Sequence, residues 1–310
     1  MTSTTPAPWE TVDPALINPR AVRLVEAFKD ALARMRDEHG LTFDDLNTVT
    51  TLLTQLHDAT GVPLSLCAMP LFSEVFQGGG DGYTISEDVD SPTCIPGSPM
   101  IDNPGTLPMR PDEPGVPLVA SGRVLDGYGN PLAGAEMVIY HASNDGIYSG
   151  IWDDGQPKYN LRGRQITDTE GRYAFTTITP VPYSNTPSQA VDAVAAAAAA
   201  LGRSLYRPAH IHYEIHHPRL LKPYRGEVYF AGDPVIPVDF VGPKIAAPSL
   251  QADTTLHDDP QDIAAHGFDR PFNTAVFDFV LKTPTSPDTA VRPLQTAWPE
   301  PKPKPQVWPS

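Results

Sequence analysis

The spacing of apolar residues changes near Leu118, and this change constrains the fold more than any other feature of the sequence. Before it, apolar residues recur every three or four positions, and after it they tend to alternate with polar ones. The first pattern is typical of amphipathic helices, and the second of strands with one buried face. We therefore expect a helical N-terminal region followed by a larger, mainly β domain.

Two helices are predicted with some detail in the N-terminal region. Asn18, followed by proline, is a start signal for the first helix, whose apolar stripe continues to Met35. Thr42, followed by two aspartates, is a start signal for the second, whose stripe ends near Leu56. A third, short helix is expected between residues 63 and 76.

The composition of the chain suggests four regions. Residues 1–82 form the helical region, which ends in a glycine-rich run. Residues 83–116 are dense in proline, glycine and serine and are predicted to be an irregular linker. Residues 117–285 form the β domain, and residues 286–310 are a proline-rich tail, expected to be extended or disordered.

The β domain is predicted to be a sandwich of two sheets. Short segments with alternating apolar residues are separated by glycine-containing turns, and one alanine-rich helix is expected at residues 188–203. Regularly spaced short strands of this kind favour a β-sandwich over a parallel sheet. The expected strands are 118–125, 135–141, 173–175, 210–216, 227–230 and 275–281.

Charge and hydropathy exclude several classes of function. The chain has 37 acidic and 22 basic residues, a formal net charge of −15. Such a chain repels phosphate backbones and anionic lipid, so we expect no nucleic-acid partner. The longest apolar run, residues 193–201, is too short to insert into a membrane. The first nine residues do not resemble a signal peptide, so a cytoplasmic protein is expected.

Two histidines two residues apart, His210 and His212, are the first candidate metal ligands. Alternate residues of a strand share a face, so both imidazoles can reach one metal ion. The same spacing also fits two histidines on a solvated strand face, and the spacing alone favours that interpretation. Cys67 and Cys94 are too few and too isolated to hold zinc or an iron–sulfur cluster.

Two tyrosines, Tyr148 and Tyr183, lie in turn-like segments of the same domain. By themselves they are expected to pack with their hydroxyl groups in water. A phenol keeps its proton up to about pH 10, so only a strongly charged cation makes it a ligand. Ferric iron favours anionic oxygen donors of this type.

Several motifs occur in a characteristic order along the β domain. They are Gly129-Asn130-Pro131-Leu132, Asn144-Asp145-Gly146-Ile147-Tyr148, Asn160-Leu161-Arg162-Gly163-Arg164, Pro180-Val181-Pro182-Tyr183 and Arg207-Pro208-Ala209-His210-Ile211-His212. Over residues 117–283 this order resembles the intradiol ring-cleavage dioxygenases, the catechol and hydroxyquinol 1,2-dioxygenases. The helical N-terminal region is similar to the family's dimerisation region, so the resemblance implies a homodimer.

The resemblance implies one mononuclear non-haem Fe(III) ion per subunit, held by Tyr148, Tyr183, His210 and His212. It further implies that Tyr183 leaves the metal when a catechol-type diol binds. Arg207 matches a family arginine that stabilises negative charge on the activated ring, a role that suits a permanent cation. The implied reaction is intradiol cleavage of the ring with O2 to a cis,cis-muconate-type product, a step in the catabolism of aromatic compounds.

The expected substrate pocket departs from the family pattern. Glu227 stands where a glutamine is usual, and could bond to Arg207 or change substrate preference. Phe240 matches a residue that contacts the ring in some relatives, although core packing explains it equally well. Ile95 and Pro99 are further pocket candidates. The segment that ends in Tyr183 resembles hydroxyquinol enzymes slightly more than catechol enzymes.

Two other functions fit parts of the sequence. The sandwich could have lost activity and serve as a binding or interaction module, because loops near the expected pocket are altered. An Fe(II) oxygenase with two histidines and one carboxylate could use His210, His212 and either Glu227 or Glu214. That second alternative leaves the two motif tyrosines unexplained.

Overall fold

The structure, a computed structural model, describes residues 18–284 except 61–67, 69–70, 72, 76, 81–82, 88–90, 92, 112, 152–154 and 185–190. The predicted tail at 286–310 therefore lies outside the described residues. The chain divides into two compact units, Met1–Thr54 and Gln55–Ser310. Each unit is described by itself.

The two predicted N-terminal helices are confirmed. They are α1 (Pro19–His39) and α2 (Phe43–Thr60), of which α2 crosses the boundary between the two units. The Asn18 side chain accepts hydrogen bonds from two backbone amides in the first turn of α1. Thr42 and Asp45 cap α2 reciprocally, since each side chain accepts from the backbone N–H of the other. These side chains pair N–H groups that a helix start leaves without partners.

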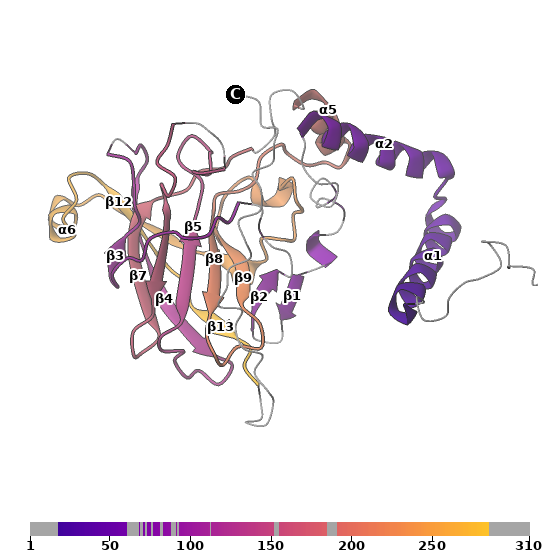
Figure 1. Cartoon of the computed structure of the whole chain (residues 1–310). Coiled ribbons are helices and arrows are strands. Elements are labelled where there is room, and N and C mark those ends of the chain that lie inside the picture. The colour runs from indigo at the N-terminus through magenta and orange to yellow at the C-terminus, as the bar shows by residue number, and fades with distance from the viewer. Residues whose placement is uncertain are drawn as a thin grey trace, which may run out of the picture. The chain divides into compact units, whose positions relative to one another are not determined.

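The predicted sandwich is also confirmed (Figure 1). One sheet has five strands in the order β10-β9-β8-β5-β6, and the other has the order β11-β12-β4-β7-β3, with β13 pairing to β4. The strands of the first sheet are β5 (Glu136–Tyr140), β6 (Arg162–Ile166), β8 (His210–His216), β9 (Tyr224–Phe230) and β10 (Gln251–Ala252). Those of the second are β3 (Gly105–Thr106), β4 (Pro117–Asp126), β7 (Arg172–Ile178), β11 (Thr254–His257), β12 (Phe272–Val276) and β13 (Phe279–Leu281).

The main core lies between the two sheets. In β8, Ile211, Tyr213 and Ile215 point into it, and they meet Phe175 of β7 and Phe279 of β13. The residues that alternate with them in β8 point to the other face of the five-stranded sheet, since strand side chains alternate. That outer face is also buried over most of β8.

The segment 83–116, predicted to be an irregular linker, is instead largely part of the domain. Residues Tyr83–Glu87 form β2, which pairs with β1 (Gln77–Gly80), and β3 pairs with β7. Leu107 lies fully buried in the main core. The prediction was wrong because prolines and glycines indicate turns but do not show whether the chain between them is packed.

Shorter elements complete the described part of the chain. The alanine-rich helix is α5 (Val191–Ala200), and the start of its predicted range lies outside the described residues. Most of the predicted third helix also lies outside them, although Ser73–Val75 forms a 3-10 turn. Two further 3-10 turns are Ile236–Val238 and Pro248–Leu250.

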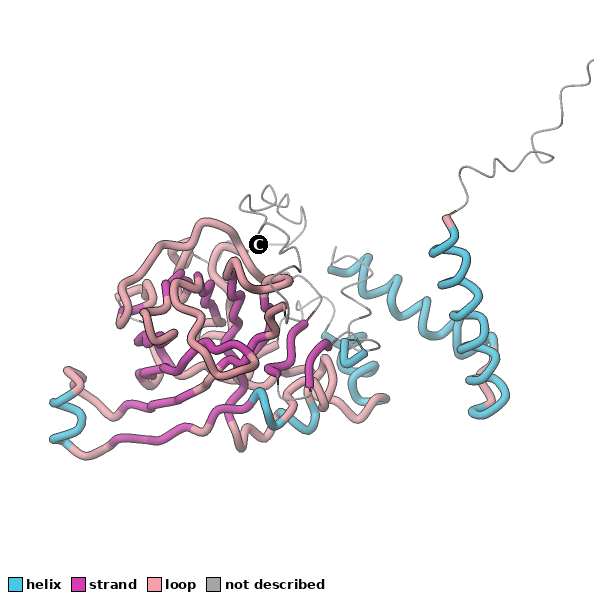
Figure 2. The backbone as a smooth tube through the Cα atoms, turned by 90° about the horizontal axis from the view of Figure 1, so that it is seen from below, coloured by secondary structure: helices cyan, strands magenta, loops and turns pink. Residues whose placement is uncertain are grey.

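A long hairpin extends from the second sheet. Its strands β11 and β12 carry the short helix α6 (Pro260–Ala265) at the tip (Figure 2). Stacked rings of His257 and Phe272 lie at the end of the strand pair next to α6, with centroids 4.7 Å apart. Among the helices that the structure describes, none combines the length and apolar content needed to cross a membrane.

Candidate metal centre

The outer face of the five-stranded sheet carries the histidines of the H-x-H motif. His210 and His212 alternate with the core residues of β8, so both imidazoles point away from the apolar core. Both are nevertheless almost fully buried, at 1% and 6% exposure. This excludes the interpretation that they lie on a solvated strand face.

Tyr148 reaches the same place from the turn that follows β5. The turn is closed by a hydrogen bond from the Ser143 N–H to the Ile147 carbonyl at 2.9 Å, and Gly146 adopts a left-handed φ of 79°. A Cβ atom at Gly146 would lie 2.9 Å from the Cβ of Tyr183. Glycine is required there because it permits both the backbone conformation and the close approach of the two tyrosine segments.

Tyr183 is brought to the site by backbone pairing with Arg207. The Tyr183 N–H donates to the Arg207 carbonyl at 3.2 Å, and the Arg207 N–H donates back at 2.8 Å. Arg207 lies just before β8, so this short bridge places the phenol over the beginning of that strand. A residue distant in the sequence from Tyr148 thus becomes its neighbour.

The polar atoms of these four side chains converge. The hydroxyl oxygens of Tyr148 and Tyr183 are 2.7 Å apart. Nε2 of His210 lies 3.0 Å from the Tyr183 oxygen and 3.3 Å from the Tyr148 oxygen. Nε2 of His212 lies 2.9 Å from the Tyr148 oxygen and 3.2 Å from Nε2 of His210. Two phenols and two imidazoles therefore point their donor atoms at one small volume.

The protonation of the two histidines suits metal binding. Nδ1 of His210 donates to the Pro208 carbonyl at 2.7 Å, so Nε2 keeps its lone pair. Burial lowers the pKa of His210 to about 4 and holds that of His212 well below its usual value, so both imidazoles are neutral near pH 7. A neutral imidazole is the form that binds metals.

The two tyrosines, unlike the histidines, are not in their metal-binding protonation state at neutral pH without a metal. Burial raises the pKa of both Tyr148 and Tyr183 above that of a free phenol. Their phenolate forms are thus stable here only beside a compensating positive charge. A trivalent cation among two neutral nitrogens and two oxygens would supply that charge, so this donor set fits a hard ferric ion.

Arg207 is held beside this cluster by a buried acidic network. Its Nη1 and Nη2 donate to the two oxygens of Glu227 at 2.6 and 2.7 Å, and Nη2 also donates to the Tyr229 hydroxyl at 2.9 Å. Asp239 lies 3.4 Å away, and the Tyr229 hydroxyl donates to Glu227. Burial opposes ionisation of Glu227, but the charge and hydrogen bonds of Arg207, together with the neighbouring histidines, hold the pKa of that carboxyl well below its usual range.

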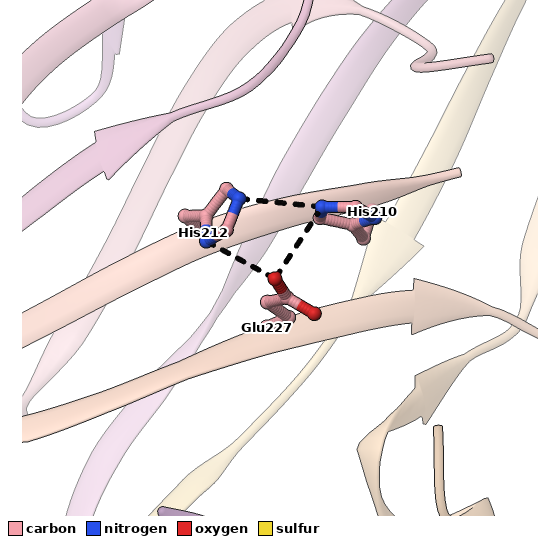
Figure 3. A group of neighbouring side chains, drawn as sticks. All are labelled: His210, His212 and Glu227. Atoms are coloured by element: carbon pink, nitrogen blue, oxygen red, sulfur yellow. Dashed lines mark hydrogen bonds and ion pairs between the residues drawn. The ribbon is translucent and has the colours of Figure 1, made fainter. Parts of the chain in front are cut away.

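Figure 3 shows His210, His212 and Glu227, which lie close enough together to bind a metal. Glu227 Oε1 is 3.5 Å from Nε2 of His210 but approaches His212 at Nδ1, 3.4 Å away. Tyr148 approaches His212 at Nε2, on the opposite side of the ring. Both Glu227 oxygens are also engaged by Arg207, so this carboxylate is better placed to support His212 than to bind a metal.

Glu214, the other carboxylate considered for such a site, is paired elsewhere. Its Oε2 lies 3.7 Å from His216 and 3.6 Å from Arg225. The geometry therefore favours the tyrosine-containing set over a site of two histidines and one carboxylate.

The residues predicted to line a substrate pocket are more scattered. Ile95 lies against Gly150, close to the Tyr148 turn. Pro99 accepts a backbone hydrogen bond from Arg164 of β6. Phe240 is half-buried and packs into a small cluster with Tyr229 and Val241. For all three residues, contact with a substrate ring therefore stays a prediction.

Three residues near the site were missed by the sequence analysis. Asp239 and Tyr229 border Arg207, and Tyr140 stacks on His212 with ring centroids 4.6 Å apart. Asp239 could have been noticed in the sequence, because it is an acidic residue within an otherwise apolar run. No local signal marks Tyr140, because its neighbours come from strands distant in the sequence.

Comparisons with known proteins agree with this arrangement. A family model described as "Dioxygenase" matches residues 89–283. The chlorocatechol 1,2-dioxygenase of Rhodococcus opacus is 32% identical over 229 residues, which cover 72% of this chain and 86% of the relative. The catechol 1,2-dioxygenase of Acinetobacter baylyi is 32% identical over 197 residues, covering 62% of this chain and 60% of the relative.

Solved structures show the same fold. The hydroxyquinol 1,2-dioxygenase of Pseudomonas putida DLL-E4 superimposes with a TM-score of 0.70 at 26% identity, covering 89% of this chain and 95% of the other. The catechol 1,2-dioxygenase of Pseudomonas arvilla C-1 gives a TM-score of 0.66 at 27% identity, covering 92% and 91%. The similarity thus extends beyond the sandwich to most of each chain.

Proposed function

The chain belongs to the family of intradiol ring-cleavage dioxygenases, and we propose that Tyr148, Tyr183, His210 and His212 hold its catalytic iron. It is an intradiol dioxygenase that acts on a catechol-type aromatic diol with O2, and this family depends in general on non-haem Fe(III). The observation that carries the proposal is the convergence of four buried donor atoms, with neighbouring atoms 2.7–3.3 Å apart. Held by these four residues, Fe(III) would supply the charge and redox chemistry that activates a bound diol towards O2.

Tyr183 is the ligand that we expect to leave when the diol binds. Its segment is tied to the rest of the site by a short backbone bridge to Arg207. Tyr148 is instead fully buried between strands and packs edge-on against Tyr140. Because burial raises the pKa of Tyr183, a phenolate released from a cation regains a proton readily. Tyr183 can therefore accept a proton from the incoming diol.

Arg207 is proposed to lie beside the bound ring and to stabilise its negative charge. The guanidinium is fixed by Glu227, Tyr229 and Asp239, so it loses little freedom when an anionic ring arrives. Glu227 also offsets part of its positive charge. We expect this carboxylate, where a glutamine is usual, to weaken the pull of Arg207 on the ring.

Activity measurements test the reaction and its substrate. The iron-loaded chain should consume O2 with catechol, chlorocatechol or hydroxyquinol and release a muconate-type product. Tyr183→Phe should slow turnover by about 100-fold, because the oxygen that is proposed to accept a proton is lost. The thermal stability of the apoprotein should not fall, because the ring is retained and only one oxygen is removed. Absence of O2 uptake with every diol, in a protein that retains iron, would favour the inactive binding module.

A homodimer is the proposed assembly, with the helical region 1–82 as its interface. In α1 the side chains of Val22, Leu24 and Phe28 are more than half exposed, and none of the helix is buried within its own unit. Exposed apolar residues on one element favour association with another surface. Phe28→Asp should shift the chain from dimer to monomer in light scattering, whereas an unchanged mass would place the interface elsewhere.

A further inference from the structure

One row of side chains crosses four strands on the outer face of the five-stranded sheet. Glu227 of β9 pairs with His212 of β8, His212 with Tyr140 of β5, and Tyr140 with Arg162 of β6. Directly opposite residues on neighbouring strands are in contact range. The Tyr140 and His212 rings lie nearly parallel, at 7° and 4.6 Å between centroids. The row thus connects Arg162 to a proposed metal ligand.

Arg162 also contacts the Tyr148 segment. Its Nε donates to the Ser149 carbonyl at 3.0 Å and to the Ser149 hydroxyl at 3.1 Å. The guanidinium carbon lies 5.1 Å from the centre of the Tyr140 ring and 5.7 Å from that of Tyr148. One guanidinium therefore touches two rings and the backbone next to a proposed ligand.

The electrostatic setting of Arg162 is unusual. The residue is 1% exposed, and its Nη2 has no hydrogen-bond partner among the residues that the structure describes. Within the described part of the chain, no carboxylate lies within ion-pair distance of it. Burying a cation without an anion has a large unfavourable free energy, and contacts with ring faces offset only part of it.

The backbone before Arg162 is strained. Leu161 is fully buried and has a left-handed φ of 57°, which is rare for a leucine. A hydrogen bond from its N–H to the Pro108 carbonyl, at 2.7 Å, holds this conformation. Strain of this kind persists where the surrounding structure enforces it, often next to functional sites.

Arg164, two residues further along β6, shows what an ordinary arginine does on this face. It pairs with Glu136 at 2.9 Å and donates to the Ser98 carbonyl, and its side chain is 28% exposed. Its charge is therefore balanced by a carboxylate and by water. The contrast within one strand singles out Arg162.

We propose that Arg162 is a positioning residue for the iron centre, acting directly on Tyr148 and through Tyr140 on His212. This inference rests on the proposed function, because it concerns two of the four proposed ligands. Arg162 orients the two ligands on the side opposite Arg207, and it places a positive charge beside the Tyr148 ring. Nothing in this role requires contact with the substrate.

The test uses the full chain loaded with Fe(III). Arg162→Met keeps much of the side-chain volume but removes the charge and the bonds to Ser149. We expect iron to pass to a chelator about 10-fold faster than from the wild type, because second-sphere contacts typically change metal affinity by 10–100-fold. We also expect the visible absorption band from tyrosinate-to-iron charge transfer to move to longer wavelength. Without the nearby cation the iron-bound phenolate gives up an electron more easily, so the transition energy falls.

Two variants separate positioning from general stability. Arg162→Lys should return the band towards its wild-type position, since the charge is restored, while iron release stays fast because the planar contacts are missing. Arg164→Met, the matched change on β6, should leave both the band and the release rate unchanged. The melting temperature of each apoprotein shows whether a substitution acts only by destabilising the fold.

The proposal is overturned if Arg162→Met keeps the wild-type band and release rate, or if Arg164→Met changes both equally. If Arg162→Met does not fold, Tyr140→Leu carries the test. That variant should release iron faster, and wild-type release would contradict the proposal. A wild-type chain that binds no iron, or binds it without a visible band, would instead refute the proposed function itself.

Discussion

The two faces of the five-stranded sheet use the same backbone for opposite purposes. On the inner face of β8, Ile211, Tyr213 and Ile215 join a large apolar core in which many neighbours share the packing. On the outer face, His210 and His212 depend on a few directional contacts each. Apolar packing is non-directional, whereas a donor atom displaced by an ångström no longer fits its partner. We therefore expect stability and activity to be separable by face.

The largest predicted effect is on the outer face. His210→Ala should abolish tight iron binding and reduce O2 uptake to the level of the apoprotein. The free energy of unfolding of the apoprotein should change by only about 1–2 kcal/mol, because His210 lies outside the main apolar core and most single substitutions cost this much. Iron content by mass spectrometry, O2 uptake and chemical denaturation give the three quantities. A variant that retains full iron and activity would remove His210 from the site.

The matching change on the inner face is Phe279→Ala. The Phe279 ring contacts Tyr213 at 5.0 Å and Phe277 at 4.9 Å between centroids. Its removal should lower the free energy of unfolding by about 3–5 kcal/mol, while the folded protein keeps its iron spectrum. Phe43→Ala is the control, since that side chain is 74% exposed, and it should change stability by less than about 0.5 kcal/mol. Loss of iron from folded Phe279→Ala would show that the faces are coupled.

A smaller effect is predicted for Glu227→Gln. Loss of the carboxylate leaves Arg207 with Asp239 as its acidic neighbour, so more of its positive charge is available to an anionic ring. We expect KM for catechol to fall by roughly fivefold, the equivalent of about 1 kcal/mol. Steady-state kinetics measure this change.

Glu214→Gln is the control for that comparison. Glu214 is also buried on the outer face but pairs with Arg225 and His216. Its substitution should leave KM unchanged. Equal changes in the two variants would mean that net charge, and not the contact with Arg207, sets substrate affinity.

The smallest predicted effect concerns Cys94, which packs beside Tyr140 and Tyr148. Burial, assisted by Glu214, raises the pKa of the thiol to about 12. Since only a thiolate is alkylated, the reaction with iodoacetamide at pH 8 should be roughly a thousandfold slower than for a free cysteine. Peptide mapping of the native and the denatured protein distinguishes Cys94 from Cys67. Rapid labelling of native Cys94 would show that water reaches this side of the site.

Structural features that depend on residues close together in the sequence could be predicted. The caps at Asn18 and Thr42 and the alternation of β8 could be predicted, because neighbouring residues set them. The single closing strand predicted at 275–281 is instead divided into β12 and β13. The four proposed ligands were found only through ordered motifs, since a lone H-x-H pattern also fits a solvated strand. Their roles as ligands remain predictions, although the structure brings their donor atoms together.

The parts that could not be predicted depend on how distant strands pair. Tyr140 stands between His212 and Arg162 only because β5 lies between β8 and β6, an order that no local pattern specifies. Asp239 borders Arg207 for the same reason. The linker assignment at 83–116 failed on a related point, since the burial of Leu107 is decided by the sheets around it.

The most direct test of the central claim is a titration of the apoprotein with Fe(III), followed by visible and resonance Raman spectra. We predict one iron per chain, a broad visible band with tyrosinate vibrations, and a weaker band in both Tyr148→Phe and Tyr183→Phe. Arg164→Met should match the wild type. A colourless iron-loaded chain, or a band that neither tyrosine substitution alters, would contradict a centre built from Tyr148, Tyr183, His210 and His212.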